Sequence, residues 1–334
     1  MKKIHITAYG STVVAHGGTK RSAQVREIAS ENGYETYEFE GLRKYSIKAI
    51  KNPMKLLHSI LVTLKYMRHD LTMSGLFCSI VYGVELLKVL EKEKDVKCII
   101  EIAAGKNLLL ANFLRVRGIS YDIYPHNIEF LVPNQVQSYF KNLSSVFKTE
   151  LAIFKMATSI HTISDLDATI IKCLGLDDVD VVPYSPVGPY LDELIYIKNN
   201  RVNSIKKDIM IIGSVSNPPT RKGLSELIKE IEKFGKRKYF LVGVGTECFK
   251  SQESAKLTIL GTVTSDVLKE KMSSCSAILI KQPQTTGILT RMIEASIAGI
   301  PIYILGDYAQ AKASGLKEVK LVSSIDEFEN KVSN

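Results

Sequence analysis

The sequence contains no tryptophan, and its five cysteines include no CxxC pair. No basic-aromatic motif of the RRM, KH or zinc-finger kind occurs, so nucleic acid is not the expected partner. The scattered, odd-numbered cysteines do not suggest a disulfide framework and predict reduced thiols in the core of a cytoplasmic protein. No GxGxxG motif follows a strand-like run, which disfavours a nicotinamide site.

Long apolar runs are also missing. The first three residues lead directly into a strand-like run, so no signal peptide is expected, and no apolar segment reaches the ~20 residues that cross a bilayer. The chain does have length and positive charge. Its 334 residues suffice for two domains, and 44 Lys and Arg against 35 Asp and Glu give a net charge of +9. This charge favours an anionic partner, such as a phosphorylated substrate or a membrane surface.

Short apolar runs alternate with helical patterns along the chain, which predicts an α/β protein with parallel, doubly wound sheets. The first unit has a strand at 4–8, a loop, a helix at 21–32 and a strand at 34–39. Residues 184–207 lack periodicity and are expected to be a linker. The predicted domains are therefore an N-terminal domain at 1–183 and a C-terminal domain at 208–334.

The most informative stretch is QTTGILTRMIEASIAGIP at 284–301. Thr286 and Gly287 are expected to turn the chain after a buried strand, and an amphipathic helix is expected to open at Ile288. Free N–H groups at such a helix start favour an anion such as a diphosphate. Glu294, about two turns further on, is placed to meet a sugar or ribose hydroxyl. An ordinary strand-turn-helix-strand unit has the same pattern.

The pattern T-G-x6-E at 286–294, followed by A-x3-G-I-P at 295–301, resembles the donor site of GT-B glycosyltransferases, especially those of family 4. The resemblance implies the GT-B fold, in which two Rossmann-like, doubly wound domains face each other across a cleft. It also implies sugar transfer from a nucleotide-sugar donor, without a metal ion or other cofactor and with retention of anomeric configuration. The family's first glutamate, which usually contacts the transferred sugar, is replaced here by Thr286.

The resemblance extends upstream to the loop after the strand at 208–212. The family places an arginine directly after the strand's glycine and a Lys-Gly pair a few residues later, both to bind the donor diphosphate. Ser214 takes the place of the arginine, Lys222 fits the lysine position after a longer loop, and Arg221 is a candidate for the missing cation. Val263 corresponds to a strand end that often touches the nucleobase. Lys222 as a solvated surface charge is the alternative interpretation.

Two features of the N-terminal half fit the same family. Gly17 and Gly18 lie in a loop that resembles the glycine loop facing the donor, because residues without side chains let the backbone approach a ligand closely; a plain loop is the alternative. His126 follows a strand at 119–124, at the sheet edge where active-site loops gather. The His-Asn-x-Glu sequence resembles an N-domain loop of some family 4 transferases, in which a histidine lies near the reacting sugar.

The candidate catalytic residues are therefore His126 and Glu294. The candidate donor-binding residues are Gly17, Gly18, Ser214, Arg221, Lys222, Val263, Thr286, Gly287, Ile288 and Leu289. No metal ligands are predicted: the pair Asp165-x-Asp167 is better explained by Ser164 as a helix N-cap followed by acids in the first turn.

Residues 41–70 carry seven Lys or Arg and a single acid, Asp70, interleaved with apolar residues. A basic amphipathic stretch is typical of an interfacial segment on anionic lipid, although a core-packed helix with a solvated basic face has the same pattern. The interfacial interpretation predicts a peripheral protein at the inner face of the plasma membrane. It suits a glycan or lipid-linked acceptor, as in bacterial envelope or capsule polysaccharide synthesis.

Two other functions fit the same residues. A nucleotide-sugar epimerase could use the same fold, but the basic stretch would then have no purpose. The chain could also be a non-catalytic GT-B subunit that binds a glycan or a partner transferase. The missing glutamate and the missing arginine are the reasons for this alternative.

Overall fold

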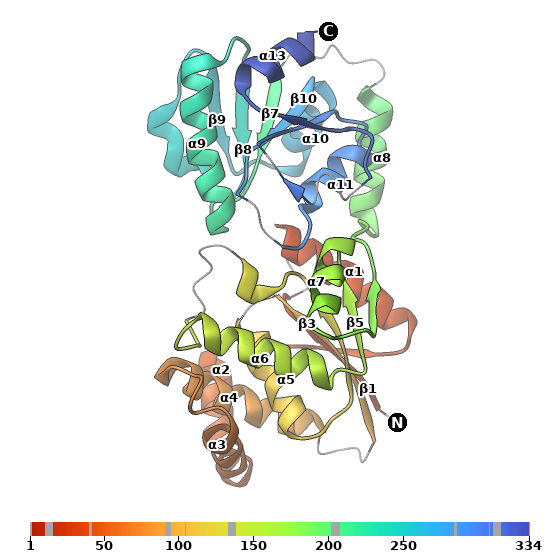
Figure 1. Ribbon diagram of the computed structural model, residues 1–334, viewed down its shortest axis with the longest axis vertical. Helices are drawn as coiled ribbons and strands as arrows, with labels where there is room; N and C mark the ends of the chain where they lie inside the picture. The colour runs from red at the N-terminus through yellow and green to blue at the C-terminus, as the bar shows by residue number, and fades with distance from the viewer. Residues whose placement is uncertain are drawn as a thin grey trace. The chain divides into compact units, whose positions relative to one another are not determined.

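The computed structural model describes residues 2–10, 16–39, 42–90, 95–103, 105–132, 138–201, 208–283, 286–306, 308–309 and 315–333. These residues form two compact units (Figure 1). The first contains the described residues up to Pro183, apart from His16 and Gly17. The second contains those two residues and the described residues from Tyr184 onward.

The first unit is built on a parallel six-stranded sheet with the order β2-β1-β3-β4-β5-β6. The strands are β1 (Lys2–Thr7), β2 (Glu35–Glu38), β3 (Val96–Ile102), β4 (Tyr121–Pro125), β5 (Ser159–Thr162) and β6 (Val179–Val181). The order reverses between β1 and β3, and loops that follow parallel strands gather at such a switch point. The edge after β1, β3 and β4 is therefore where a site is expected in this unit.

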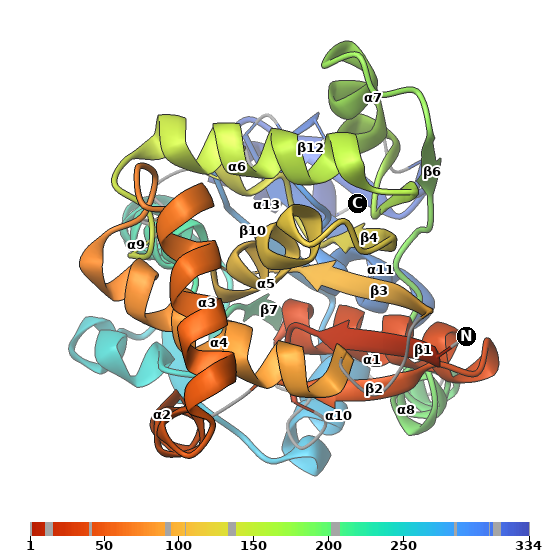
Figure 2. The same cartoon turned by 90° about the horizontal axis from the view of Figure 1, so that it is seen from below.

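Helices cover both faces of this sheet. They are α1 (Gly17–Glu31), α2 (Leu42–Ile50), α3 (Pro53–Tyr66), α4 (Met73–Leu90), α5 (Gly105–Val116), η1 (Glu129–Leu131), α6 (Leu143–Met156) and α7 (Asp165–Cys173). The main apolar core lies between the sheet and α4, α5 and α6, and a smaller one lies under α1. The helices α2 and α3 pack against α4 (Figure 2).

The basic stretch at 41–70 forms two helices, because Pro53 occupies the first position of α3 and separates it from α2. By length and composition alone, α4 is apolar enough to span a bilayer, with a mean hydropathy of 1.6, which the sequence analysis did not expect. More than half of that span is buried in the unit, so α4 has the packing of a core helix. All five cysteines were expected in the core as free thiols. Cys78, Cys98 and Cys275 are buried, but Cys173 and Cys248 are exposed.

The second unit has its own parallel six-stranded sheet, with the order β12-β11-β10-β7-β8-β9. The strands are β7 (Ile209–Ile212), β8 (Tyr239–Val242), β9 (Leu257–Gly261), β10 (Ala277–Ile280), β11 (Ile302–Leu305) and β12 (Val319–Val322). Most are unbroken apolar runs, such as AILI and IYIL, because both faces are covered. The fold class predicted from the alternation of strands and helices is confirmed in both units.

The helices of the second unit are α8 (Pro189–Arg201), α9 (Pro218–Phe234), η2 (Thr246–Gln252), α10 (Ser265–Ser274), α11 (Thr290–Ile297) and α13 (Ile325–Ser333). The core on one face is formed with α9 and α13, and the core on the other face with α8, α10 and α11. Figure 1 shows α9 and α8 on opposite sides of this sheet.

Helix α8 lies within the stretch for which the sequence predicted a linker without periodicity. Its residues Leu194 and Ile197 are buried, whereas Ile195 and Tyr196 are exposed, so apolar residues occur on both sides of the helix and mask its period. At its end, the Arg201 guanidinium donates to the carbonyl oxygens of Met272 (2.7 Å), Cys275 (2.8 Å) and Gly299 (3.2 Å). The helix is thereby an integral part of the second unit. Residues 202–207 lie outside the described residues.

Candidate functional site

The candidate donor site of the second unit lies where β7 and β10 end. These strands are direct neighbours in the sheet, so the loops that follow them gather at one edge. Helix α9 begins after the first loop and α11 after the second. The two helices cover opposite faces of the sheet, but their first turns come from the same edge.

Lys222 is positioned by the glycine that follows it. A Cβ atom at Gly223 would lie 2.0 Å from the carbonyl oxygen of Lys281, so only glycine lets α9 approach the end of β10 this closely. Asn217 is the N-cap of α9, and its side chain accepts from the backbone N–H of Thr220. The Lys-Gly pair therefore has a packing reason, which fixes Lys222 beside the end of β10.

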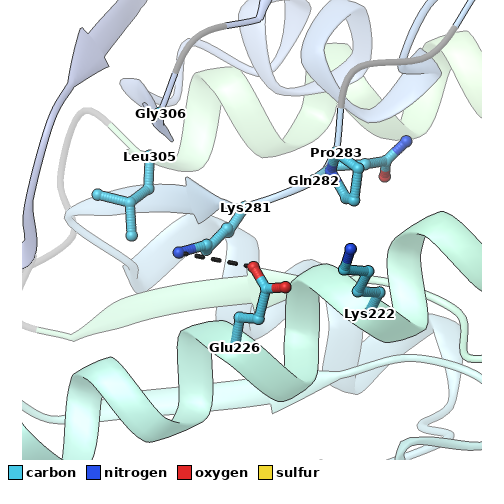
Figure 3. A pocket seen from close by; sticks show the side chains of 7 residues that line it. All are labelled: Lys222, Glu226, Lys281, Gln282, Pro283, Leu305 and Gly306. Atoms are coloured by element: carbon cyan, nitrogen blue, oxygen red, sulfur yellow. Dashed lines mark ion pairs between the residues drawn. The ribbon is translucent and has the colours of Figure 1, made fainter.

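Lys222 lines a cavity of about 230 Å³ together with Glu226, Lys281, Gln282, Pro283, Leu305 and Gly306 (Figure 3). In this view the Lys222 amine points toward Gln282 and Pro283. Lys281 is paired with Glu226 at 3.8 Å and with Glu230 at 2.5 Å. Within the described part of the chain Lys222 forms no ion pair, so it is the lysine of this cavity whose charge is not neutralised by a neighbouring carboxylate.

A buried hydrogen-bond network joins the first turns of α9 and α11. The Gln282 Oε1 atom accepts from Thr220 Oγ1 (3.0 Å) and from Arg291 Nη2 (2.6 Å). Arg291 Nη1 in turn donates to the backbone oxygen of Ile212, the last residue of β7, at 3.0 Å. Burial lowers the pKa of Arg291 to about 10, partly offset by Tyr308 and Glu294, so the guanidinium stays charged at neutral pH. A fixed positive charge therefore lies at this edge, contributed by Arg291, which no local sequence pattern marks.

Glu294 lies one turn beyond Arg291 on α11 and is only 5% exposed. Its two carboxylate oxygens accept hydrogen bonds from two tyrosines, Oε1 from Tyr184 Oη at 3.0 Å and Oε2 from Tyr190 Oη at 2.7 Å. Burial, followed by the nearby Glu294 carboxylate, raises the pKa of Tyr190 above its usual value, which keeps the hydroxyl protonated as a donor. The carboxylate is thus held in one orientation.

The sequence predicted that this helix begins at Ile288. In the structure α11 begins two residues later, at Thr290. Gly287 has a φ of 76°, a backbone conformation that favours glycine. Leu289 is the N-cap without a side-chain hydrogen bond, so the amides of Gly287, Ile288 and Leu289 precede the helix instead of forming its first turn. Thr286 is buried, and residues 284–285 lie outside the described residues.

The remaining donor-site candidates lie after β7, on α9 and after β9. Ser214 follows β7, and its hydroxyl is hydrogen-bonded to that of Ser216 at 2.6 Å. Arg221 is exposed on α9. Val263 follows β9, which is two strands away from β7, and packs against the core under α8, α10 and α11. Lys222, Glu294 and the residues that precede α11 thus lie near the ends of β7 and β10. Val263 lies further along the same edge of the sheet.

Gly17 and Gly18 form the first turn of α1 and are not in a loop, because the helix predicted from Arg21 starts four residues earlier. His126 directly follows β4, as predicted, and is 6% exposed. Its backbone N–H donates to the oxygen of Ile102, and its Nε2 atom lies 2.9 Å from Glu101 Oε2. Burial lowers the pKa of His126, with Glu101 acting in the opposite direction, so the ring is neutral at pH 7.

The helix cap predicted at Ser164 is confirmed, since its side chain accepts from the backbone N–H of Asp167 at 3.2 Å. Asp165 and Asp167 are the acids of that first turn. Among the described residues, no group of three or more His, Cys, Asp or Glu side chains is arranged to hold a metal ion.

No family model matches the sequence, and a search of curated proteins finds no match. Solved structures do match. Sucrose-phosphate synthase from Thermosynechococcus elongatus is 12% identical with a TM-score of 0.63, over all of this chain and 89% of that one. The catalytic domain of starch synthase IV from Arabidopsis thaliana, bound to ADP and acarbose, is 10% identical with a TM-score of 0.59, over 99% of this chain and 90% of that one. The chain therefore has the GT-B glycosyltransferase fold, which confirms the predicted resemblance at the level of the fold.

Proposed function

We propose that the protein is a glycosyltransferase that moves a sugar from a nucleotide-sugar donor to a glycan or lipid-linked acceptor. The observation that carries the proposal is the arrangement at the ends of β7 and β10, where Lys222, Arg291 and Glu294 are connected. Lys222 lies beside Gln282, which accepts from Arg291, and Glu294 follows Arg291 by one turn of α11. On the GT-B fold, this edge of the second unit supplies both positive charge for a diphosphate and a fixed carboxylate for a hydroxyl group.

The chemistry assigned to these groups is electrostatic. During transfer, the bond between the anomeric carbon and the diphosphate oxygen breaks, and its electron pair stays on the diphosphate. The acceptor hydroxyl oxygen forms the new bond to that carbon, and its proton passes to the leaving diphosphate or to solvent. Lys222 and the amides of Gly287, Ile288 and Leu289 stabilise the developing charge, assisted by Arg291, so the step as proposed requires no metal ion.

Glu294 is assigned to the hydroxyls of the donor, most naturally those of the ribose. A carboxylate can accept about four hydrogen bonds, so the bonds from Tyr184 and Tyr190 do not saturate it. His126 is assigned to the transferred sugar or the acceptor, as the family resemblance implies. With Thr286 in place of the usual glutamate, the sugar is held without that carboxylate, and the resemblance to family 4 supports a retaining reaction.

We further propose that the first unit docks on an anionic membrane through α2 and α3. The buried residues of α3 include Ser59 and Thr63, which are bonded to the backbone oxygen of Ile80 and the hydroxyl of Ser79 on α4. Leu57, Leu61 and Leu64 of the same helix are exposed, whereas Val62 packs against the core. The exposed apolar residues of α2, α3 and the start of α4 are Ile47, Ile50, Met54, Leu57, Leu61, Leu64, Tyr66, Met73 and Phe77.

Exposed leucines together with buried hydroxyl residues are unusual for a helix that packs its apolar face on a core. It favours the interfacial interpretation of the basic stretch over a core-packed helix with a solvated basic face. Lys48 on α2, Lys51 in the turn after it and Lys65 on α3 are exposed. Near an anionic surface each basic residue contributes about 1 kcal/mol, and each inserted large apolar side chain about 1.5 kcal/mol or more. Such a surface suits a lipid-linked acceptor in bacterial envelope or capsule synthesis.

The activity is tested by incubating the purified protein with a panel of nucleotide sugars and measuring release of the free nucleoside diphosphate. Release that is abolished in Glu294→Gln and Lys222→Ala, and retained in the exposed-lysine control Lys229→Ala, is the expected result. An epimerase would change the sugar while it stays attached to the nucleotide. Binding of a nucleotide sugar with no turnover, in the presence of glycan and lipid-linked acceptors, would support a non-catalytic subunit.

Membrane docking is tested by sedimentation with vesicles of phosphatidylcholine alone or with phosphatidylglycerol. The wild type should bind the anionic vesicles, and both Lys48→Gln/Lys51→Gln and Leu57→Ser/Leu61→Ser should reduce binding. A matched double variant on α9, Lys229→Gln/Lys233→Gln, removes the same charge from another helix and should bind normally. Equal binding of all four proteins, or none by the wild type, rejects the docking surface.

A further inference from the structure

A buried polar cluster lies beside His126 in the first unit, and neither the sequence analysis nor the proposed reaction assigns it. Its centre is Glu101 on β3, which is 0% exposed. His5 on β1 and Ser22 on α1 are equally hidden, at 0% and 1% exposed. Because β1, β3 and β4 are neighbours in the sheet, His5, Glu101 and His126 come from three adjacent strand positions at the switch point.

Among the described residues, the Glu101 carboxylate is contacted by three hydrogen-bonding side chains. The Oε1 atom lies 2.7 Å from His5 Nε2, and the Oε2 atom lies 2.9 Å from His126 Nε2. Ser22 Oγ also donates to Oε2. The other ring nitrogen of His5 lies 3.1 Å from Thr36 Oγ1, so His5 is itself held from both sides.

These contacts determine the ionisation state of the carboxyl. Burial opposes ionisation of Glu101, but the hydrogen bonds from His126 and His5 outweigh it and hold the pKa of this carboxyl well below its usual range. An ionised carboxylate only accepts hydrogen bonds. Each histidine nitrogen that faces it must therefore carry a hydrogen, which fixes the neutral His126 ring as the tautomer with its hydrogen on Nε2.

A buried charge of this kind is costly unless it is fully hydrogen-bonded, and apolar residues usually fill such strand positions at lower cost. The neighbours of Glu101 on β3 and of His5 on β1 are isoleucines, as in the runs IIEI and IHI. The charge thus interrupts two apolar strands and lies directly against the residue that the family resemblance assigns to the reacting sugar. This placement points to a role exerted through His126.

We propose that Glu101 is a positioning residue that fixes the ring orientation and the tautomer of His126, so that the ring meets its substrate as a hydrogen-bond acceptor. An acceptor nitrogen selects a hydroxyl group, of the transferred sugar or of the acceptor, and does not bind a phosphate. The substrate assignment rests on the proposed glycosyl transfer. The control of the His126 tautomer by Glu101 does not depend on that activity.

The decisive experiment is therefore independent of turnover. Nitrogen NMR shifts of histidine side chains report which ring nitrogen carries the hydrogen, and His126→Gln identifies the His126 signals. The wild type should show the Nε2–H tautomer of His126. Glu101→Gln, which can present either a donor or an acceptor to the ring, should give a mixture of tautomers and a still lower pKa of His126, because the carboxylate that opposes the effect of burial is gone.

A wild-type His126 with its hydrogen on Nδ1 overturns the proposal even if Glu101→Gln does not fold. The same tautomer in unchanged proportion in Glu101→Gln also overturns it. The matched control is Glu150→Gln, because Glu150 is a fully buried carboxyl of the same unit that bonds to the backbone N–H groups of Glu129 and Phe130 and not to His126. This variant should leave the His126 signals in place.

The second readout is turnover of the nucleotide sugar identified above. Glu101→Gln should lower kcat by about 10²-fold, the usual cost of misplacing a reacting group, with little change in the KM for the donor, and should alter the pH profile. Glu101→Asp, which keeps the charge, should recover part of the rate. An unchanged kcat and pH profile, together with the tautomer shift seen by NMR, would overturn the proposed role of His126 in transfer while leaving its positioning by Glu101 established.

Discussion

The two tyrosines that bond Glu294 allow a test of the geometry of the proposed donor site. Tyr184→Phe and Tyr190→Phe each remove one hydroxyl and leave the rest of the side chain in place. In the native protein these hydroxyls donate to the two oxygens of one carboxylate, at 3.0 and 2.7 Å. Glu294 and Tyr184 are only 5% and 3% exposed, so water cannot easily replace the lost donors.

A hydrogen bond to a charged group contributes about 1.5–3 kcal/mol, and the shorter bond from Tyr190 is expected at the upper end. A loss of about 2 kcal/mol lowers the melting temperature of a unit of this size by roughly 4–8 °C. The double variant should lose less than the sum of the single losses, because both bonds serve the same carboxylate. Thermal unfolding followed by circular dichroism or calorimetry measures these shifts.

The control is Tyr196→Phe, on the same helix as Tyr190, since the Tyr196 side chain is 59% exposed. It should melt within about 1 °C of the wild type, as surface substitutions usually do. Both Tyr184→Phe and Tyr190→Phe should also bind a nucleoside diphosphate more weakly, because Glu294 is no longer fixed. If Tyr184→Phe and Tyr190→Phe melt and bind as Tyr196→Phe does, the two tyrosines do not hold Glu294 and the geometry described for it is wrong.

Three further predictions concern stability. Burial, with the neighbouring carboxyl of Glu129, raises the pKa of Glu150 to about 8 from an ordinary 4.5. The contribution of Glu150 to the free energy of unfolding is therefore largest below pH 4.5 and is lost as the pH rises through about 8. The difference in free energy of unfolding between Glu150→Gln and the wild type, measured with urea, should therefore shift in favour of the variant by roughly 3 kcal/mol between about pH 5 and pH 8. A difference that does not change with pH would contradict this prediction. Arg201→Met should cost about 3 kcal/mol or more in the same assay, because three backbone oxygens lose a charged donor; a loss below about 1 kcal/mol would show that α8 is not anchored there. Gly223→Ala should cost about 1–3 kcal/mol and weaken nucleoside diphosphate binding, since its Cβ would lie 2.0 Å from the Lys281 oxygen, whereas an unaffected melt would refute this close approach.

The sequence predicted the features that are local in the chain. The alternation of apolar strands and helices was enough for two parallel sheets, because a buried strand such as AILI and a helix cap such as Ser164 are determined by neighbouring residues. Lys222, expected at the end of a long loop, lies within α9, and Glu294 lies on α11 as expected. The matches to solved GT-B structures confirm the fold. The roles of these residues remain predictions.

The sequence did not predict contacts between distant residues. The partners of Glu294 are 104 and 110 positions away, and Glu101 is 96 positions from His5. No short pattern marks such pairs, although a charged residue inside an apolar strand, as in IIEI, is a signal that a partner must exist. The predicted starts of α1 and α11 were wrong because glycine occurs in both helical and turn conformations. Composition alone therefore does not locate the first residue of such a helix.

The most direct test of the account is calorimetric titration of the purified protein with nucleoside diphosphates and nucleotide sugars. The account predicts that at least one nucleoside diphosphate binds at a single site, and that Lys222→Ala and Glu294→Gln weaken binding by tenfold or more, equivalent to about 1.4 kcal/mol or more. Lys229→Ala, on the same helix as Lys222, should bind like the wild type. The absence of binding by any nucleoside diphosphate or nucleotide sugar, or equal affinity in all four proteins, would contradict a donor site at the ends of β7 and β10.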